Sequence, residues 1–368
     1  MATQQNYIAR FNRNIAALFT AALRLGLRHP RWLPFLARTA LSQRSAARRR
    51  RTWERRGTHV PPLLVVSVTH QCNLNCAGCY ARERHRPDAR LLDIGRLGVL
   101  LDEAAGLGVS IVMIAGGEPL LRRELFDLTA RHPGIVFPLF TNGLLVDGAV
   151  ISELKRQRHV VPVISLEGTP EQTDLRRGGG VHQRLLRSLS DLSRNGILAG
   201  CSLTVTSENH ATVTDPAFIA ELADRGSGVF FFVEYVPVSA GSEAMVLSAG
   251  QRRDLIGFAK RMQRGHAGLF IVFPGDEEQY GGCLAAGRGF VHVSPEGMLE
   301  PCPFAPYGDA DLATMSLTEA LRSDLLRAIR EQHGTLTETA GGCALWQNRE
   351  WLQTLHQRHV ETNSTHGA

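Results

Sequence analysis

Short apolar runs alternate with longer amphipathic stretches through the middle of this chain. Runs rich in β-branched or aromatic residues, bounded by glycine or polar turns, predict buried strands, and the longer periodic segments predict helices. We expect strands at Leu63–Val68, Val109–Ala115, Ile135–Phe140, Val160–Leu166, Ile197–Thr206 and Gly228–Val236, and helices at Leu91–Leu107, Leu121–Arg131, Val150–Arg156, Leu185–Asn195 and Asp215–Arg225. Such regular alternation predicts parallel βαβ units and an α/β fold.

The first sixty residues follow a different pattern. Ile15–Leu27 and Trp32–Leu41 are apolar with interspersed Arg, and Arg48–Arg51 is a basic run. Residues 1–60 hold thirteen Arg, no Lys and one acid, so they carry +12, and the remaining 308 residues carry −6. We expect a basic helical extension. It either lies on an anionic membrane surface through residues 1–56 or packs on the rest of the protein, and the scarcity of aromatic residues disfavours nucleic acid.

Composition indicates the size class of the protein and the cellular compartment expected for it. The chain has 368 residues, of which 43% are hydrophobic, and these values are typical of one large globular domain with appendages. No uninterrupted apolar stretch reaches the roughly eighteen residues that a membrane-spanning helix needs, and the signal-peptide order of charge, apolar core and cleavage site is missing. Seven cysteines with metal-type spacing indicate a reducing compartment. We therefore expect a cytoplasmic protein, with peripheral association at the inner face of the membrane as the alternative.

Three cysteines follow the first predicted strand on one short loop, and we call Cys72, Cys76 and Cys79 the loop cysteines. Neighbouring cysteines on a loop rarely meet the geometry of a disulfide, so their spacing favours a metal. A closed iron–sulfur cluster needs four ligands, and three therefore leave one iron open to a small molecule. Structural zinc is disfavoured, because zinc sites usually show two CxxC pairs, or one CxxC and a distant His pair.

The spacing CxxxCxxC, with the aromatic Tyr80 directly after the last cysteine, resembles the cluster loop of the radical S-adenosylmethionine (SAM) enzymes. The resemblance implies a partial (β/α)6 barrel whose first strand leads into a [4Fe–4S] cluster on the loop cysteines, with SAM on the fourth iron. It also implies reductive cleavage of SAM to methionine and a 5′-deoxyadenosyl radical, which abstracts hydrogen from a substrate. In parallel α/β barrels ligands lie at the carboxyl ends of the strands, where this loop falls.

Further motifs resemble the SAM-contacting segments of that family. The tetrapeptide Gly116–Pro119 follows the second predicted strand, and its two glycines let a ligand approach the backbone, which in the family meets the amino group of SAM. Ser165–Gly168 resembles the ribose-contacting motif, in which a carboxylate accepts from the sugar diol. Arg177 is positioned like the arginine that faces the SAM carboxylate, although Arg176 competes for that role. The cofactor-binding residues that the resemblance implies are Tyr80, Gly116, Gly117, Glu118, Asn142, Ser165, Glu167 and Arg177.

Two residues at the end of the sixth predicted strand are candidates for chemistry on the substrate. Glu234 and Tyr235 stand at the mouth of the expected barrel. Substrate contact or proton transfer is one interpretation of them, and a structural hydrogen bond is the other. Cys201, inside an apolar strand, predicts a free core thiol.

The C-terminal part brings three more cysteines, Cys283, Cys302 and Cys343, which we call the C-terminal cysteines. The elements expected here are a helix at Arg252–Gln263, a strand at Leu269–Phe273, a hairpin of Phe290–Val293 with Met298–Glu300, and a helix at Leu317–Arg330. The pattern C-x13-G-x4-C, centred on Gly297, resembles the hairpin that opens the SPASM and Twitch extensions, which carry auxiliary iron–sulfur clusters. The CxxC pairs of a full SPASM set are absent, so the resemblance implies one auxiliary cluster, of the [4Fe–4S] type. Its fourth ligand stays open among substrate, water and His292, and zinc remains an alternative.

The sequence thus predicts three parts: a basic helical extension over residues 1–60, a radical SAM partial barrel over 61–250 and a small Twitch-like cluster domain over 251–368. We expect an enzyme that performs a peptide or protein modification or a small-molecule oxidation, with a membrane lipid as the alternative substrate. A reductant such as flavodoxin or ferredoxin is the expected partner. The alternative function is a non-catalytic SAM-binding iron–sulfur protein that transfers electrons or acts as a sensor.

Overall fold

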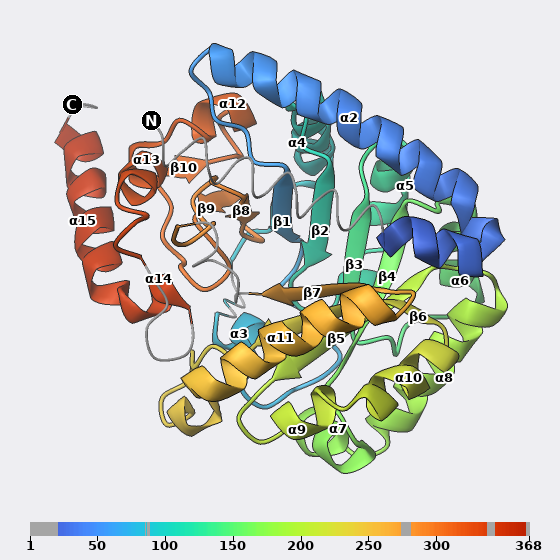
Figure 1. The fold of residues 1–368 in the computed structure, drawn as a ribbon. Coiled ribbons are helices and arrows are strands. Elements are labelled where there is room, and N and C mark those ends of the chain that lie inside the picture. Colours follow the sequence, from blue (N-terminus) through green and yellow to red (C-terminus); the bar gives the residue numbers. More distant parts are fainter. Residues whose placement is uncertain (1–20, 85, 87–88, 274–280, 337–342, 366–368) are drawn as a thin grey trace.

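The fold is a curved sheet with helices along its outer face (Figure 1). The computed structural model describes residues 21–84, 86, 89–273, 281–336 and 343–365. The predicted segment Ile15–Leu27 lies partly outside these residues, and residues 21–27 of it are helical. Within the described part of the chain, no helix combines the length and the apolarity needed to cross a membrane.

Ten strands form one sheet in the order β10-β9-β8-β1-β2-β3-β4-β5-β6-β7. They are β1 (Leu63–Ser67), β2 (Ile111–Ala115), β3 (Phe137–Thr141), β4 (Val160–Leu166), β5 (Ala199–Val205), β6 (Ser227–Glu234), β7 (Leu269–Phe273), β8 (Phe290–Val293), β9 (Met298–Glu300) and β10 (Ala310–Asp311). Neighbours from β8 through β1 to β7 pair in parallel, and only the small β8–β9–β10 ribbon is antiparallel. The predicted α/β class and all the predicted strands are therefore confirmed.

The helices connect and cover these strands. They are α2 (Leu33–Arg55), α3 (Tyr80–Glu83), α4 (Ile94–Leu107), α5 (Leu125–Ala130), α6 (Gly148–Arg156), α7 (Pro170–Arg177), α8 (Val181–Arg194), α9 (His210–Val213), α10 (Pro216–Asp224), α11 (Ala249–Gly265), α12 (Leu317–Ala320), α13 (Asp324–Glu331), α14 (Ala344–Gln347) and α15 (Arg349–Thr365), with 3-10 turns η1 (Pro30–Trp32), η2 (Pro119–Leu121) and η3 (Glu243–Met245). One long helix had been expected at Leu317–Arg330, but two short helices form there, because Ser323 caps a new helix through its side chain.

The sheet crosses the boundary that the sequence suggested at residue 250. The helix α11 leads into β7, which pairs in parallel with β6, and β8 of the C-terminal part pairs in parallel with β1. In this register His292 lies beside Val65. The six-stranded core of the expected barrel is thus extended at both edges, and the hairpin that carries Cys302 is joined directly to the strand that leads into the loop cysteines.

The two faces of the sheet bury separate apolar cores. The larger core joins alternate strand residues such as Leu64 and Val66 to the surrounding helices. The second core joins the opposite strand faces, including Val163 and Phe231, to Leu25 and Trp32 of the extension. Period-two alternation along the strands explains why neighbouring residues enter different cores.

The extension packs against the amino-terminal ends of the strands. Trp32 is buried and its indole Nε1 donates to the Gly196 carbonyl oxygen at 3.1 Å, just before β5. Leu25 lies against Gly228 at the start of β6. Arg50 of α2 donates to the Gly108 carbonyl oxygen at 2.5 Å, ahead of β2. These contacts are the ones that the packed interpretation of the extension predicts, and they lie at the end of the barrel opposite to the candidate site.

Candidate functional site

The loop cysteines lie directly beyond the carboxyl end of β1. Cys72 is exposed, and Cys76 and Cys79 are partly buried. The Asn142 amide, from the turn after β3, lies 3.8 Å from the Cys72 sulfur. Burial raises the pKa of the Cys72 and Cys76 thiols, and the nearby charge of Arg177 acts in the opposite sense on Cys76. Across the described residues, no three His, Cys, Asp or Glu side chains already share the positions of metal ligands.

The glycine pair after β2 is joined to the cluster loop through the backbone. The Gly117 amide donates to the Thr69 carbonyl oxygen at 2.7 Å, and the Glu118 amide donates to the Gln71 carbonyl oxygen at 2.8 Å. A Cβ atom at Gly117 would stand 2.0 Å from the same Gln71 oxygen, and Gly116 has a φ of +123°. Only glycine permits this close approach, so the two motifs that lie far apart in sequence form one continuous surface.

The buried carboxylate of Glu118 holds this part of the site in place through hydrogen bonds. Glu118 is fully buried, and its carboxylate accepts hydrogen bonds from the Thr141 hydroxyl and the backbone N–H of Asn142, at 2.7 Å each. It also accepts one from the backbone N–H of Leu120 at 3.0 Å. Burial raises the pKa of Glu118, against the effect of these donors. The carboxylate therefore holds the turn after β3, and with it Asn142, towards Cys72.

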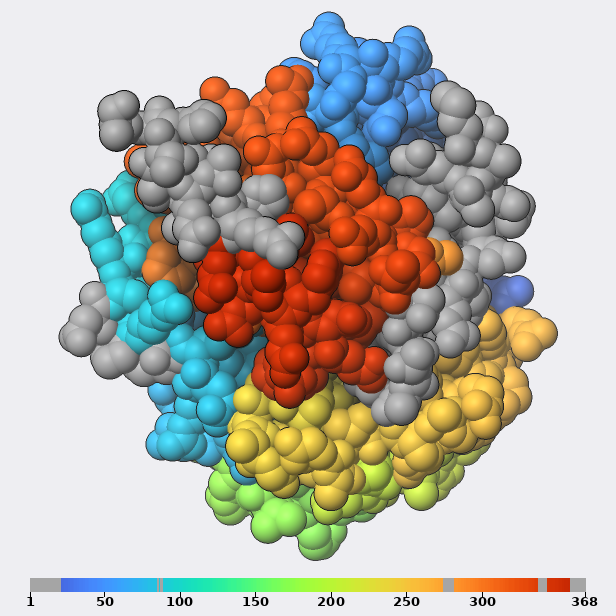
Figure 2. Space-filling model, turned by 90° about the vertical axis from the view of Figure 1, so that its left-hand side faces the viewer, coloured from blue at the N-terminus to red at the C-terminus, as the bar shows by residue number. Residues whose placement is uncertain are grey.

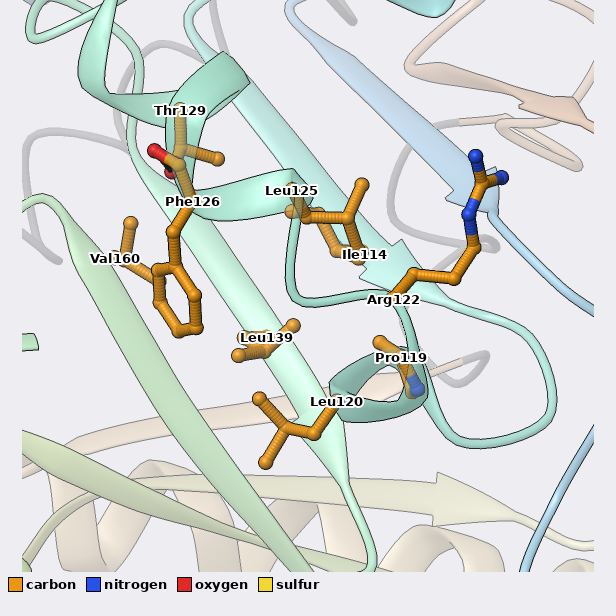
Figure 3. A pocket seen from close by; sticks show the side chains of 9 residues that line it. All are labelled: Ile114, Pro119, Leu120, Arg122, Leu125, Phe126, Thr129, Leu139 and Val160. Carbon is orange, nitrogen blue, oxygen red and sulfur yellow. Dashed lines mark hydrogen bonds between the residues drawn. The ribbon is translucent and has the colours of Figure 1, made fainter. Parts of the chain in front are cut away.

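A small apolar pocket lies behind the glycine turn (Figure 3). Its lining comes from β2, η2, α5, β3 and β4, and includes Ile114, Leu120, Phe126 and Leu139. Arg122 stands at its rim and donates to the Val68 carbonyl oxygen at 2.8 Å. The pocket belongs to the packing that supports the site, and offers no group for chemistry.

The predicted ribose motif lies at the carboxyl end of β4. Ser165 lies opposite Ser202 of β5, and Glu167 is almost completely buried. The Glu167 Oε2 accepts from Arg176 at 2.7 Å, and its Oε1 accepts from the Arg177 Nε at 2.8 Å. Burial alone would raise the pKa of Glu167, but the two guanidinium groups outweigh it and hold that pKa below its usual range.

Glu234 and Tyr235 lie at the end of β6, as expected from the sequence. Glu234 is buried, and its Oε2 accepts two hydrogen bonds from Arg252 of α11, at 2.6 and 2.8 Å. The Tyr235 hydroxyl is buried without a hydrogen-bond partner among the described residues, and it lies 2.7 Å from where a Cβ atom of Gly78 would stand. Glu234 is therefore held in a structural ion pair, whereas Tyr235 lies against the backbone between Cys76 and Cys79.

The C-terminal cysteines are all buried, although they come from three separate segments. The Cys302 sulfur accepts from the Phe304 amide at 3.3 Å, and the Cys283 sulfur lies 3.5 Å from the Ala285 amide. The Cys343 thiol contacts Cys302, and this hydrogen bond, together with burial, raises its pKa well above the usual value. Backbone N–H groups directed at cysteine sulfurs are typical of iron–sulfur ligands, whose potentials they tune. The donor set therefore fits a cluster.

His292 is occupied by other partners. Its Nε2 lies 2.8 Å from the Ser67 hydroxyl, at the end of β1, and its Nδ1 lies 2.7 Å from the Glu300 carboxylate of β9. Tyr80 also hydrogen-bonds to Ser67, and burial raises the Tyr80 pKa to about 12. Both ring nitrogens of His292 are thus engaged, which disfavours it as a fourth cluster ligand. Instead it links the C-terminal hairpin to Ser67 at the end of β1, and through Ser67 to Tyr80 of α3.

Several of these residues were not found by sequence reasoning. The Ser67–His292 contact and the pair of His70 with Glu296, at 2.7 Å, depend on β8 lying beside β1. Arg176 was noted only as a competitor of Arg177, yet its side chain also reaches the cluster loop. The signal available in the sequence was the arginine pair close after the ribose motif. Cys201, in contrast, is fully buried in the core as expected.

Figure 2 shows the C-terminal segment beside the segment that carries the loop cysteines. The Tyr80 and Phe304 rings meet there, with their centroids 5.4 Å apart. The site is therefore a cysteine loop at the carboxyl end of a parallel barrel, with the segment that carries buried Cys302 packed beside it. Cysteines at this end of an α/β barrel are placed where such folds bind ligands.

Residues 66–215 match the Radical SAM superfamily, so this part of the chain is a radical SAM domain. It is 29% identical over 310 residues to the mycofactocin maturase MftC of Mycolicibacterium smegmatis, covering 78% of this chain and 76% of that protein. It is 26% identical over 251 residues to the PqqA peptide cyclase of Gluconobacter oxydans, covering 66% and 70%. It is also 24% identical over 324 residues to the AdoMet-dependent heme synthase of Methanosarcina barkeri, covering 80% and 90%.

Solved structures share the fold. Streptococcus suis SuiB bound to its precursor peptide SuiA superposes with a TM-score of 0.62 at 18% identity, over 77% of this chain and 70% of that one. The predicted radical SAM fold is thus confirmed. The protein is an enzyme that uses a [4Fe–4S] cluster and SAM, and the alternative of a non-catalytic sensor is not favoured, because the relatives include maturases and synthases.

Proposed function

We propose that this radical SAM enzyme modifies a peptide. The [4Fe–4S] cluster would be held by the loop cysteines. The observation that carries the SAM chemistry is the backbone joined between the cluster loop and the glycine pair at Gly117 and Glu118, and the peptide substrate rests on the similarity to a maturase and a peptide cyclase. When bound, the cluster and SAM would supply the radical chemistry that removes a hydrogen atom from the substrate. The protein's own contribution is to orient SAM and to exclude water.

The remaining residues have separate roles in this proposal. The backbone of Gly116 and Gly117 receives the amino group of SAM, and Asn142 and Tyr80 border the cluster. Glu167 accepts from the ribose, with Ser165 beside it on β4. Arg177 faces the SAM carboxylate, since all three side-chain nitrogens of Arg176 already have partners. Glu118 does not contact SAM in this proposal, and its role is to hold the turn that carries Asn142.

The C-terminal cysteines would hold one auxiliary [4Fe–4S] cluster. Their burial and the backbone N–H groups directed at the sulfurs support an iron–sulfur cluster over zinc. Its expected role is to accept an electron from the substrate or to bind it. Tyr235, whose hydroxyl is buried without a partner among the described residues, is the remaining candidate for substrate contact, whereas the ion pair with Arg252 makes Glu234 a supporting residue.

The names of two relatives support the substrate class. A maturase and a peptide cyclase are similar to this chain over more than half of its length. A small-molecule substrate of the porphyrin type is the second candidate, because a heme synthase is similar over 80% of the chain. The expected electron donor is a flavodoxin or a ferredoxin.

Anchorage of residues 1–56 to an anionic membrane surface is a further part of the proposal. The packing of Leu25 and Trp32 inside the barrel weakens it, and the exposed Leu23, Leu27 and Leu41 favour it. Co-sedimentation with anionic and with neutral vesicles at two salt concentrations tests it. Binding to the anionic vesicles that falls as salt rises would support the anchor, and equal, negligible pelleting would end it.

Anaerobic reconstitution tests the enzyme itself. The dithionite-reduced protein should cleave SAM to 5′-deoxyadenosine, and the Cys76→Ala variant should not. Short peptides encoded next to the gene and iron porphyrins are then offered in parallel, and the product is identified by mass spectrometry. Turnover of the porphyrin alone would replace the peptide proposal, and absence of SAM cleavage would contradict both.

A further inference from the structure

One side chain touches both halves of the proposed SAM site. The Arg176 Nη1 donates to the Glu167 Oε2 at 2.7 Å, on the ribose side. Its Nε donates to the Ala77 carbonyl oxygen at 3.0 Å, and its Nη2 lies 3.5 Å from the Gly78 carbonyl oxygen, between Cys76 and Cys79. The Ala77 amide in turn donates to the Arg176 carbonyl oxygen at 3.0 Å. The end of α7 is therefore fastened to the cluster loop by side chain and backbone.

The neighbouring arginine has a different set of contacts. Arg177 donates to the Glu167 Oε1 through two of its nitrogens, and its charge acts on Cys76, but among the described residues its side chain donates no hydrogen bond to the cluster loop. Among the described residues Arg176 is the one hydrogen-bond donor to the Glu167 Oε2, and a carboxylate oxygen can accept a further hydrogen bond. A ribose hydroxyl bound at Glu167 would thus meet the oxygen that Arg176 orients.

Burial of Glu167, Arg176 and Arg177 strengthens the hydrogen bonds between them. Side-chain exposure is 3% for Glu167, 15% for Arg176 and 9% for Arg177. Charge-assisted hydrogen bonds are stronger and more directional when they are shielded from water. A guanidinium with all three nitrogens occupied cannot shift at one end without losing contacts at the other. If a bound cluster fixes the conformation of the loop, Arg176 therefore also fixes the position of the Glu167 carboxylate.

We propose that Arg176 is a positioning residue that couples nucleoside binding at Glu167 to cluster binding at the loop cysteines. A protein whose loop is ordered by the cluster presents Glu167 in the orientation that the ribose needs, and a bound nucleoside in turn retains the cluster. The proposal rests on the proposed function, since it takes Glu167 as the ribose-binding carboxylate. Such coupling is reciprocal by thermodynamic necessity.

The test uses a nucleoside that has no amino-acid group to bind iron. The affinity of the full chain for 5′-deoxyadenosine is measured by titration calorimetry, with and without the reconstituted cluster. We expect it to bind the cluster-loaded protein about fivefold or more tightly, within the usual range of coupling. The analogue 2′,3′-dideoxyadenosine lacks the diol and should show no such preference. An equal affinity of 5′-deoxyadenosine for both forms of the wild type would overturn the proposal.

Variants then assign the coupling to the residue. Arg176→Lys keeps the charge, but its single nitrogen cannot replace the three separate nitrogens that Arg176 directs at Ala77, Glu167 and Gly78, and its affinity ratio should fall to about one. Leu175→Ala, at an 86% exposed neighbouring position, should keep the wild-type ratio. Arg177→Lys should weaken SAM binding and still keep the ratio. An Arg176→Lys ratio equal to that of the wild type would reject the assignment.

A measurement on the wild type alone guards against misfolded variants. Because a bound nucleoside stabilises the cluster-loaded protein when the two sites are coupled, 5′-deoxyadenosine should slow the removal of iron by a chelator, and dideoxyadenosine should leave it unchanged. Iron release at the same rate with either nucleoside would reject the coupling. SAM cleavage without coupling leaves the proposed function intact, whereas absent SAM cleavage contradicts the function itself.

Discussion

The two groups of cysteines in this enzyme are organised in opposite ways. The loop cysteines lie within eight residues on one strand-to-helix connection, and each is at least partly accessible. The C-terminal cysteines span sixty residues of sequence and are all buried. The first group is shaped by neighbouring segments, through Gly117 and Arg176. The second receives hydrogen bonds mainly from the residues just after each cysteine.

The difference follows from what each site has to do. A cluster that binds SAM needs an open side and a loop whose position other ligand-binding segments control. A cluster that passes electrons or binds substrate benefits from burial, because burial and hydrogen bonds to sulfur set its potential. The comparison therefore predicts that damage to the loop cysteines ends all chemistry, and that damage to the C-terminal cysteines separates SAM cleavage from product formation.

The largest expected effect comes from the cysteines themselves. Cys76→Ala should abolish 5′-deoxyadenosine formation, because two thiolates cannot hold the SAM-binding cluster. Cys343→Ala should keep SAM cleavage and lose product. Iron analysis and product quantification on the same preparations measure both, with about eight iron per chain expected in the wild type from two [4Fe–4S] clusters. Product formation by Cys343→Ala would show that the auxiliary cluster is dispensable.

Two glycines allow a matched comparison of the supporting backbone. A Cβ atom would stand 2.0 Å from the Gln71 oxygen at Gly117, and 2.1 Å from the His333 oxygen at Gly282, which also has a φ of +114°. Gly117→Val should weaken SAM binding at least about tenfold, which corresponds to about 1.4 kcal/mol, and should also lower iron at the adjoining loop. Gly282→Val should lower the iron content by the amount that the auxiliary cluster holds, and should leave SAM binding unchanged. Calorimetric titration measures the SAM affinity of both variants. An equal loss of SAM affinity in the two variants would contradict the separation of the sites.

A smaller effect is expected where the two sites are joined. His292→Phe removes hydrogen bonds to Ser67 and Glu300, and should cost about 1–3 kcal/mol in the free energy of unfolding. The ratio of product to 5′-deoxyadenosine should also fall. Ser67→Ala should be less severe, and the double variant should be less destabilised than the sum of the two, as expected for contacting residues. Additive losses in denaturant unfolding would mean that the contact contributes nothing.

The smallest effect concerns the metal-free protein. Iodoacetamide should label Cys72 first, since it is exposed, and should label the buried Cys343 much later. The hydrogen bond to Cys302 and burial raise the Cys343 pKa well above its usual value, so little thiolate is present at pH 8 and labelling stays slow as the pH rises to 9. Peptide mapping after timed labelling gives the order. Rapid labelling of Cys343 would show that the C-terminal cysteines are not packed before the cluster binds.

The local motifs of the fold and site were readable from the sequence, and the contacts between them were not. The strand that leads into Cys72 and the one that leads into Gly116 were predicted, because short apolar runs and turn glycines are local features. The pairing of β8 with β1 joins segments more than 220 residues apart, and nothing in either run specifies its neighbour. Arg176 was ambiguous for the same reason, since its partner Ala77 is 99 residues away. The assigned ligands and SAM contacts stay predictions.

The helix α2 was also longer than its apolar pattern indicated. The apolar stretch ends at Leu41, but α2 continues through Arg48 to Arg55, within the basic helical extension predicted over residues 1–60. Arg is a good helix former, and α2 packs along α4, where Arg50 reaches the carbonyl oxygen of Gly108. Basic residues that look like a separate surface in the sequence are thus partly used to fasten the helix.

The position of this extension has a consequence for how the enzyme meets its substrate. The strands β4 and β5 have seven residues each, so at about 3.3 Å per residue the two ends of the barrel lie roughly 23 Å apart. Trp32 and Leu25 close one end, and the loop cysteines open the other. A bilayer that held the extension would leave the reactive mouth pointing towards water, and a lipid would have to leave the bilayer to reach it. The architecture therefore favours substrates delivered from solution, even for a membrane-bound population of the enzyme.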